Sequence, residues 1–270
     1  MPTIVLLNQK GGVGKTSTCH HVAGALAVAG RKVLLVDVDP QASLTQGFWG
    51  PAATRQLPLA ATIAAVLAGD EPFPDQIIKP TGITGIDLVP GSRHAVEYNV
   101  PAPHRVDPAV QGALHDFLAE VGGRYDQVII DCPPNLHLCS WAALVAADYL
   151  IVPLQPEDYG AQGIIDVQES IERVRGGPNP SVRTLGLLPT MVNSRLSVHR
   201  TYEAMLREIY GMLVFETVVP LSTDFKEALG SRQPVALYKP RGAAAKAIKA
   251  LVEEIDQRVA DSARISRGAA

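Results

Sequence analysis

Apolar residues follow two alternating patterns along the chain. Short continuous apolar runs rich in β-branched residues predict strands, and longer segments with helical spacing predict helices between them. Because the strand runs are apolar at nearly every position, we expect a mostly parallel sheet that is buried on both faces. The expected strands are residues 3–7, 33–38, 86–89, 127–131, 149–153 and 184–188, and the expected helices are residues 16–29, 108–121, 138–146, 160–174, 198–210 and 242–259.

The order of these segments predicts the fold class. A repeated strand, helix, strand order with right-handed crossovers gives a doubly wound α/β fold, in which helices flank a mostly parallel sheet. Residues 47–58 and the proline-rich residues 100–108 are the least regular stretches, and we expect them to be surface loops. Neither is long enough to link independent domains, so residues 1–270 are expected to form one domain.

Composition narrows the possible classes of protein. Hydrophobic residues make up 47% of the 270 residues, which is enough for a large core and argues against disorder. No apolar run approaches the roughly 18 residues needed to span a bilayer, and no signal peptide precedes the first strand, so we expect a cytoplasmic protein. Cys19, Cys132 and Cys139 form neither an even disulfide set nor a metal-binding CxxC pair, and we interpret them as packing residues in a reducing compartment.

Charge is distributed unevenly along the chain. The formal net charge is −3, which by itself argues against a nucleic-acid partner. The stretch from Arg173 to Lys249, however, contains twelve basic residues and only five acidic ones. A local basic surface could therefore bind a phosphate backbone on a protein that is acidic elsewhere. Ordinary solvated helix faces are the alternative interpretation of the same counts.

A glycine-rich segment, residues 10–16, reads KGGVGKT and lies between a predicted strand and a predicted helix. Such a segment turns successive backbone N–H groups toward phosphate oxygens at the positive end of a helix dipole. Lys15 is expected to contact the β- and γ-phosphates, and the Thr16 hydroxyl to bind Mg²⁺. The expected nucleotide-binding residues of this segment are Lys10, Gly11, Gly12, Val13, Gly14, Lys15, Thr16 and Ser17.

Acidic residues follow two of the buried strands, where open α/β sheets place their ligands. Asp131 ends an apolar run in the manner of a Walker B carboxylate and is expected to hold a Mg²⁺-bound water. Asp37 and Asp39 end the second strand. Asp37 either acts through the metal's water shell or supports the following loop. For both Asp37 and Asp39, capping of the following helix is the structural alternative.

The loop departs from the general Walker A pattern in two ways. Gln9 stands where that pattern has glycine, and the loop carries a second lysine, Lys10. The string KGGVGKT, together with DPQASLT at residues 39–45 and DCPP at residues 131–134, resembles the deviant Walker A ATPases of the ParA family. The resemblance extends from about Ile4 to about Glu254. It implies an ATPase with ATP and Mg²⁺ as cofactors, in which Lys10 reaches the nucleotide of a partner subunit and Asp39 positions the attacking water and joins the metal shell. Lys10, Lys15 and Asp39 are thus the implied catalytic residues.

The resemblance also implies a base site and a DNA surface. Asn193, Pro220 and Ser222 correspond to segments that surround adenine in this family. Leu221 and Asp224 occupy a stretch in which family members commonly carry arginines, so part of the DNA surface is lost or reversed in charge. The expected DNA-binding residues are Arg195, Arg200, Arg207, Lys226, Lys246 and Lys249.

The expected cycle is that of a partition ATPase. An ATP-bound homodimer would bind double-stranded DNA without sequence preference on the nucleoid, turn over slowly alone, and be released when a ParB-type centromere-binding protein stimulates hydrolysis. No helix-turn-helix precedes the first strand, so we expect no operator recognition. An ATPase that positions a protein cargo on the nucleoid is the alternative, because its site chemistry would be identical. A P-loop kinase or ligase would leave Lys10 without a task.

A membrane-associated regulator of the MinD kind is a further alternative, because the last predicted helix carries one apolar stripe. That stripe lacks Phe and Trp, and neighbouring acidic residues would be repelled by anionic lipid. We therefore expect it to pack in the core and expect no membrane partner. Its residues are Ile248, Leu251, Val252, Ile255 and Val259.

Overall fold

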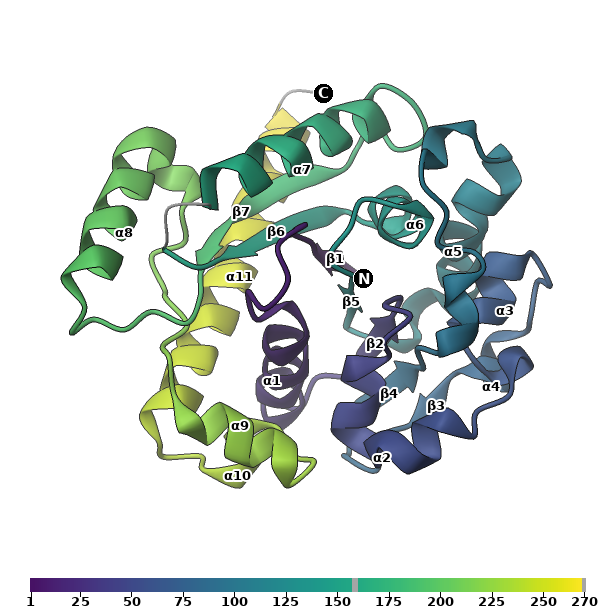
Figure 1. The fold of residues 1–270 in the computed structure, drawn as a ribbon, viewed down its shortest axis with the longest axis horizontal. Coiled ribbons are helices and arrows are strands. Elements are labelled where there is room, and N and C mark those ends of the chain that lie inside the picture. Colours follow the sequence, from purple (N-terminus) through teal and green to yellow (C-terminus); the bar gives the residue numbers. More distant parts are fainter. Residues whose placement is uncertain (157–159, 269–270) are drawn as a thin grey trace.

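A computed structural model describes residues 1–156 and 160–268 of the chain. Its described part contains a sheet of seven strands in the order β3-β4-β2-β5-β1-β6-β7 (Figure 1). All neighbouring strands are parallel except β3 and β4, which are antiparallel at one edge. The strands are β1 (Thr3–Leu6), β2 (Val33–Asp37), β3 (Lys79–Pro80), β4 (Ile86–Val89), β5 (Gln127–Asp131), β6 (Tyr149–Leu154) and β7 (Arg183–Pro189).

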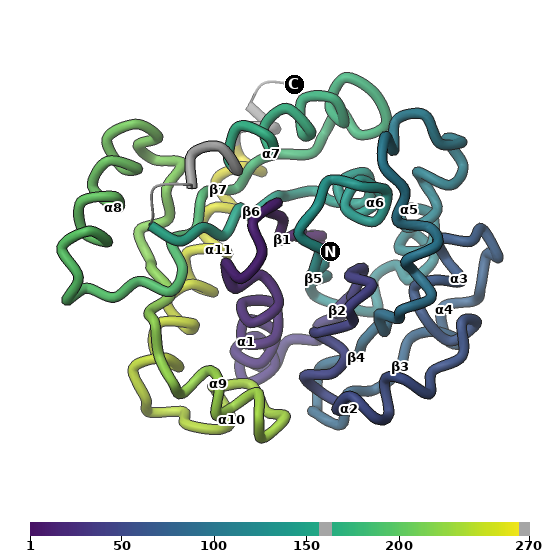
Figure 2. Tube along the Cα trace, viewed as in Figure 1, coloured from purple at the N-terminus to yellow at the C-terminus, as the bar shows by residue number. Residues whose placement is uncertain are grey.

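Helices cover both faces of this sheet, which confirms the predicted doubly wound α/β fold. The first face is covered by α1 (Lys15–Val28), α2 (Ser43–Arg55), α9 (Thr223–Gly230), α10 (Val235–Tyr238) and α11 (Ala243–Gly268). The second face is covered by α3 (Ile63–Ala68), α4 (Pro74–Ile77), α5 (Pro108–Val121), α6 (Leu138–Ala146) and α7 (Gly160–Arg175). Helix α8 (Ser197–Tyr210) stands at the β7 end, apart from α1 (Figure 2). Single 3₁₀ turns occur at Leu59–Ala61, Arg93–Val96, Pro103–Arg105, Gly122–Arg124 and Gly211–Leu213.

Side chains of the central strands alternate between the two cores. In β1, Ile4 and Leu6 belong to the core under α1, whereas Val5 packs in the core under α5 and α6. Strand β5 repeats this, because Ile129 faces α1 and its neighbours Val128 and Ile130 face the other side. Every residue of these strands is buried, as the continuous apolar runs predicted.

Helix α11 packs its apolar stripe against the first face, as expected. Ile248, Leu251, Val252 and Ile255 are buried there, and Val259 is partly buried against the same core. None of the helices in the described part of the chain has the length and apolar character needed to span a bilayer.

Arg258 and Glu254 fasten the same helix to the segment after β7. Arg258 donates hydrogen bonds to the carbonyl oxygens of Leu185, Met212 and Val214, and its guanidinium lies 4.2 Å from the centre of the Phe215 ring. The Glu254 carboxylate accepts hydrogen bonds from the backbone N–H groups of residues 216 and 217. Helix α11 therefore holds the backbone that leads to Pro220.

Two expectations about local structure were wrong. Residues 47–58 are not a loop as far as Arg55, because α2 continues through them with a break at Gly50. Pro51 follows that break, where a new helical turn starts and the missing N–H costs little. The last helix also continues beyond residue 259, to Gly268. The short elements β3, α3, α4, α9 and α10 were not expected, because their runs are too short to show a period.

Candidate active site

The phosphate loop connects β1 to α1 and is shaped by glycines. Gly12 and Gly14 have φ values of 77° and 82°, in the left-handed region that favours glycine. Gly14 is the N-cap of α1, and no side chain caps this helix start. The first N–H groups of α1 are therefore available to an anion.

Lys15 lies over this loop and is 6% exposed. Its Nζ donates hydrogen bonds to the carbonyl oxygens of Asn8 at 2.9 Å and Lys10 at 3.0 Å. Burial lowers the pKa of Lys15, and the nearby carboxylates of Asp131 and Asp39 oppose that shift. The ammonium group is thus held among the atoms where the loop would receive phosphate.

Asn8 anchors the start of the loop. Its amide nitrogen donates to the carbonyl oxygen of Pro153 at 2.8 Å, and its side-chain oxygen accepts from the backbone N–H of Lys10 at 2.9 Å. Sequence reasoning did not single out Asn8, because its role depends on β6, which lies beside β1 but more than a hundred residues away in sequence.

The carboxylates of β2 and β5 lie side by side, because Asp37 is the register partner of Asp131. Asp37 is fully buried and accepts hydrogen bonds from the Thr45 N–H at 2.9 Å and the Thr45 hydroxyl at 2.7 Å. Burial raises the pKa of Asp37 to about 7. Thr45 lies in the first turn of α2, so the geometry supports the interpretation of Asp37 as a support for this helix start.

Asp39 lies just past β2 and is 7% exposed. Its Oδ1 accepts a hydrogen bond from the Gln41 N–H at 2.8 Å. Burial raises the pKa of Asp39, and this hydrogen bond and the Lys15 ammonium act in the opposite direction. The carboxylate therefore lies within the electrostatic field of the phosphate loop.

Asp131 is fully buried, and its Oδ2 has no hydrogen-bond partner within the described structure. Burial raises the pKa of Asp131, Asp37 raises it further, and the Thr16 hydroxyl opposes the shift. A buried carboxylate oxygen without a partner beside a hydroxyl fits a hard divalent cation or its water.

No three His, Cys, Asp or Glu side chains form a preformed metal cage in the described part of the chain. Cys19, Cys132 and Cys139 are all buried, as expected of packing residues.

Two of the predicted base-site residues, Asn193 and Pro220, lie on paired segments that are linked to the phosphate loop. Val192 forms a parallel bridge with Pro220, and the Leu221 N–H donates to the Val192 carbonyl at 2.9 Å. This places Asn193 beside Pro220. Thr190 links the segment to the loop, because its hydroxyl donates to the Val13 carbonyl at 2.8 Å.

Two of these side chains also have local structural partners. The Ser222 hydroxyl accepts from the Asp224 N–H at 3.2 Å and caps α9. The Asn193 side-chain oxygen accepts from the Arg195 N–H at 3.1 Å. Ser17 lies in the first turn of α1 and is half-buried.

Comparison with known proteins identifies the family. A model of the AAA domain matches residues 1–184. The chain is 36% identical to the chromosome-partitioning ATPase Soj of Thermus thermophilus over 259 residues, covering 96% of this chain and 97% of that protein. The chain belongs to the ParA/Soj family of ATPases. This membership confirms the predicted ATPase class, with ATP and Mg²⁺ as its cofactors.

The chain is also similar to a second partition protein and to a solved structure with a different name. The chromosome partitioning protein ParA of Caulobacter vibrioides is 35% identical over 260 residues, with 96% of this chain and 95% of that protein covered. Cobyrinic acid a,c-diamide synthase of Mycobacterium smegmatis, solved with a bound ATP analog and magnesium, is 29% identical with a TM-score of 0.78. That likeness covers 94% of this chain and 93% of the solved one.

The six predicted DNA-binding residues of this ParA/Soj-type ATPase lie on several elements. Arg195 precedes α8, Arg200 and Arg207 belong to α8, Lys226 to α9, and Lys246 and Lys249 to α11. Their partners differ: Arg207 pairs with Glu203 at 2.9 Å, Lys249 pairs with Glu253 at 3.8 Å, and Arg200 donates to the Ser194 carbonyl at 2.6 Å. The bond from Arg200 to Ser194 brings its side chain next to the segment that carries Arg195.

The two departures from the family pattern have clear surroundings. The Leu221 side chain is 55% exposed. Asp224 pairs with Lys239 at 2.7 Å, so the acidic replacement neutralises a basic neighbour. Asp224 and Lys239 therefore contribute no net charge to this corner of the molecule.

Proposed function

We propose that this protein is a DNA-partitioning ATPase of the nucleoid in the cytoplasm. Two ATP-bound subunits close face to face, the dimer binds double-stranded DNA without sequence preference, and a ParB-type partner releases it by stimulating hydrolysis. The ATPase part of this proposal is carried by the arrangement of the 10–16 loop, Asp39 and Asp131 at the ends of three adjacent strands. Similarity to chromosome-partitioning proteins over nearly the whole chain supports it.

Each residue of the site has a proposed task. Lys15 and the loop N–H groups bind the phosphates, and the Thr16 hydroxyl and Asp131 hold Mg²⁺ or its water. The metal neutralises charge on the phosphates. Asp39 lies just past the end of β2 and is 7% exposed. There it orients the attacking water and contributes to the metal shell. Asn193, Pro220 and Ser222 border the base.

Lys10 is proposed to couple nucleotide binding to dimerisation. A second lysine in a loop built for backbone contacts adds positive charge without burying apolar surface. It is useful where it meets the phosphates of the neighbouring subunit, as a residue supplied in trans does in other P-loop enzymes.

Light scattering coupled to gel filtration tests this role. We expect wild type to dimerise with ATP and Mg²⁺, Lys10→Ala to bind ATP but stay monomeric, and Lys15→Ala to lose nucleotide binding. Lys32→Ala is the matched control, because Lys32 is exposed at the opposite end of β2. An ATP-dependent dimer in Lys10→Ala would remove the proposed role of Lys10.

Gel-shift titrations test the DNA step. With ATP, the protein should shift unrelated duplexes equally, and binding should weaken about tenfold or more between 50 and 200 mM salt if several phosphates are contacted. Arg195→Ala should weaken all duplexes alike, and Arg124→Ala, on an exposed arginine paired with Asp75, is the control. Binding that depends on sequence, or that ignores ATP, would contradict the proposal.

Positioning of a protein cargo on the nucleoid is the second candidate function. The exposed Leu221 and the Asp224–Lys239 pair favour it, because they leave an apolar and nearly neutral surface where a partition protein would be basic. Replacement of Leu221 by arginine should increase DNA affinity if DNA lies there. If the substitution instead blocks recruitment of a partner without affecting DNA affinity, the cargo function is favoured.

A further inference from the structure

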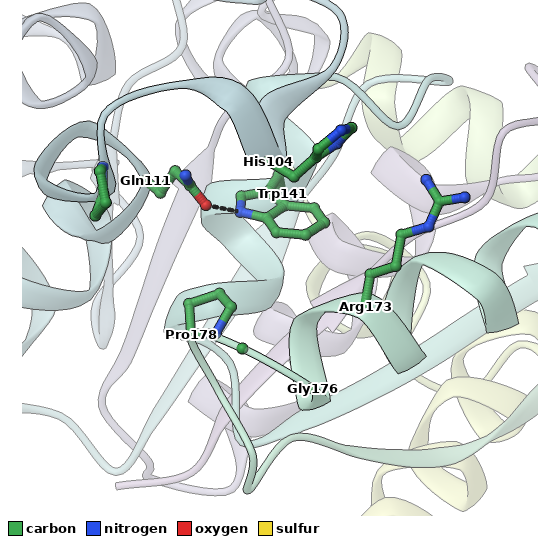
Figure 3. Close-up of a pocket in the computed structure, with 8 residues that line it drawn as sticks. His104, Gln111, Trp141, Arg173, Gly176 and Pro178 are labelled. Carbon is green, nitrogen blue, oxygen red and sulfur yellow. Dashed lines mark hydrogen bonds between the residues drawn. The ribbon is translucent and has the colours of Figure 1, made fainter.

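A cavity of about 950 Å³ lies between the start of α5, the middle of α6 and the end of α7. The proposed function gives it no task. Figure 3 shows its labelled residues grouped around the Trp141 indole. The lining residues are His104, Pro108, Gln111, Trp141, Arg173, Gly176, Gly177 and Pro178.

The floor of this cavity is fixed by buried hydrogen bonds. Trp141 is 5% exposed, and its indole N–H donates to the Gln111 side-chain oxygen at 2.7 Å. The Gln111 amide nitrogen in turn donates to the Val106 carbonyl at 2.7 Å. The indole therefore cannot rotate without breaking a buried pair, so the floor is already in place before a ligand arrives.

Two nitrogen-bearing side chains stand on one side of the indole. In Figure 3, His104 and Arg173 both lie beyond the ring edge that faces away from Gln111. The His104 and Trp141 ring centres are 6.5 Å apart. The Arg173 side chain is 63% exposed, and its ion pair with Glu169 is long, at 3.9 Å. Such a surface pair contributes little, so the guanidinium can exchange it for a better anion.

We propose that this cavity binds a small planar aromatic molecule that carries a carboxylate or phosphate group. The apolar edge of Trp141 and the rings of Pro108 and Pro178 accept the aromatic part, and Arg173 binds the anion with its two-pronged guanidinium while His104 donates a hydrogen bond. The volume falls within the range of small-molecule sites, and His104 and Arg173 lie on one side of a mostly apolar lining, away from Gln111.

The same side chains connect this cavity to the phosphate loop. A smaller adjoining hollow of about 250 Å³ is also lined by His104, Trp141 and Arg173, and it reaches Gln9, which precedes Lys10, and Leu136. A ligand that fixes Arg173 and His104 therefore changes the wall of a hollow beside the nucleotide. We expect the bound ligand to alter ATP turnover, and this consequence rests on the proposed function, whereas binding itself does not.

The indole N–H signal of Trp141 in a ¹H–¹⁵N spectrum reports binding directly. In a Trp49→Phe background, Trp141 provides the remaining indole signal, and saturating Mg-ADP keeps probes out of the nucleotide site. The probes are two charged and neutral pairs: 2-naphthoate with 2-naphthamide, and guanosine 5′-monophosphate with guanosine. We expect at least one charged probe to shift the signal saturably, with an affinity about tenfold above its neutral partner. The pair that responds shows whether carboxylate or phosphate is the preferred anion.

Arg173→Gln should remove the preference for the charged probe, and Arg124→Gln, on a distant exposed arginine, should retain it. The Lys15→Ala variant should still bind the probe, so failure of the ATPase proposal would not be mistaken for failure of this one. The inference is overturned if no probe shifts the indole signal saturably at millimolar concentrations. It is equally overturned if Arg173→Gln and Arg124→Gln bind the charged probe alike.

Discussion

The two faces of the sheet are packed differently. On the face that carries α1, Gly24 lies so close to α10 that an added Cβ would be 2.0 Å from the Pro234 Cβ. His20 and His21 are buried in the same layer, with ring centres 5.1 Å apart. On the opposite face, α5, α6 and α7 leave the Trp141 cavity open. The close contacts around Gly24 make the α1 face the tight one at this point and fix the helix that begins at the phosphate loop, whereas the looser packing around Trp141 leaves space for a ligand.

The largest effect is expected from low pH, which should destabilise the fold through the buried histidines of the tight face. Burial lowers the pKa of His20 to about 4 and that of His21 to about 3, both below the ordinary value of 6.5. Below pH 6.5 the unfolded chain takes up protons on these rings while the folded chain does not. The free energy of unfolding therefore decreases as the pH is lowered. Each histidine should lose about 2 kcal/mol between pH 7 and pH 5.

Urea unfolding at both pH values measures this loss. Asp37, whose pKa is raised to about 7 by burial, acts in the opposite direction, so the informative quantity is the difference between wild type and a His20→Leu, His21→Leu variant. The double variant should lose less stability than wild type between pH 7 and pH 5. The control His115→Leu, which replaces an exposed histidine, should lose as much stability as wild type. Equal pH dependence in wild type and the double variant would show that these rings are not buried as neutral groups.

The close approach of α1 and α10 gives the next largest effect. Gly24→Ala should destabilise the fold by about 3 kcal/mol, because the methyl group would overlap the Pro234 ring and force the two helices apart. The same shift should weaken Mg-ADP binding, since α1 begins at Lys15. Calorimetric unfolding and ADP titration measure the two effects. Wild-type stability in Gly24→Ala would mean that this face can relax as readily as the other.

A smaller effect is expected at the floor of the cavity. Trp141→Phe removes the donor to Gln111 and should cost about 2 kcal/mol, because a buried acceptor is left without its partner. Adding Gln111→Leu should recover part of this loss, since both polar partners are then gone. Urea unfolding of the two single variants and the double variant forms the cycle. Strict additivity of the two single effects would contradict a coupled pair.

The smallest effect is expected at Gly112 in α5, on the looser face. An added Cβ would meet its nearest heavy atom, Asp116 Oδ2, at 3.9 Å, which is ordinary contact. Gly112→Ala should therefore stabilise the fold by about 0.5 kcal/mol through helix propensity. Thermal unfolding beside Gly24→Ala gives the sharpest comparison of the faces. A destabilised Gly112→Ala would show that α5 is packed as tightly as α1.

The parts of the site that could be predicted are formed by residues that are adjacent in the sequence. The 10–16 loop and the acidic ends of β2 and β5 each occupy a few neighbouring positions, and burial on both faces makes the strands continuous apolar runs. The role of Asp37 was left open, because its partner Thr45 comes from a separate element, α2, and Thr45 in turn accepts from the Gly91 N–H. Helix α2 was missed because Gly50 and Pro51 resemble a loop signal.

Contacts between distant segments account for the rest. Thr190 reaches Val13 across 177 positions, and His21 accepts from the Val235 N–H across 214. Neither pair leaves a local pattern in the sequence. The cavity is likewise formed by three helices whose apolar stripes predict burial but not the gap that remains between them.

The strand order has a consequence for biosynthesis. β1 precedes both of its neighbours, β5 and β6, by more than a hundred residues in the chain, so the ribosome makes them much later. At common translation rates the apolar strand Thr3–Leu6 waits about ten seconds for a partner. A nascent chain of this topology is thus exposed to aggregation until β5 is synthesised, and its yield in cells should depend on chaperones that shield β1.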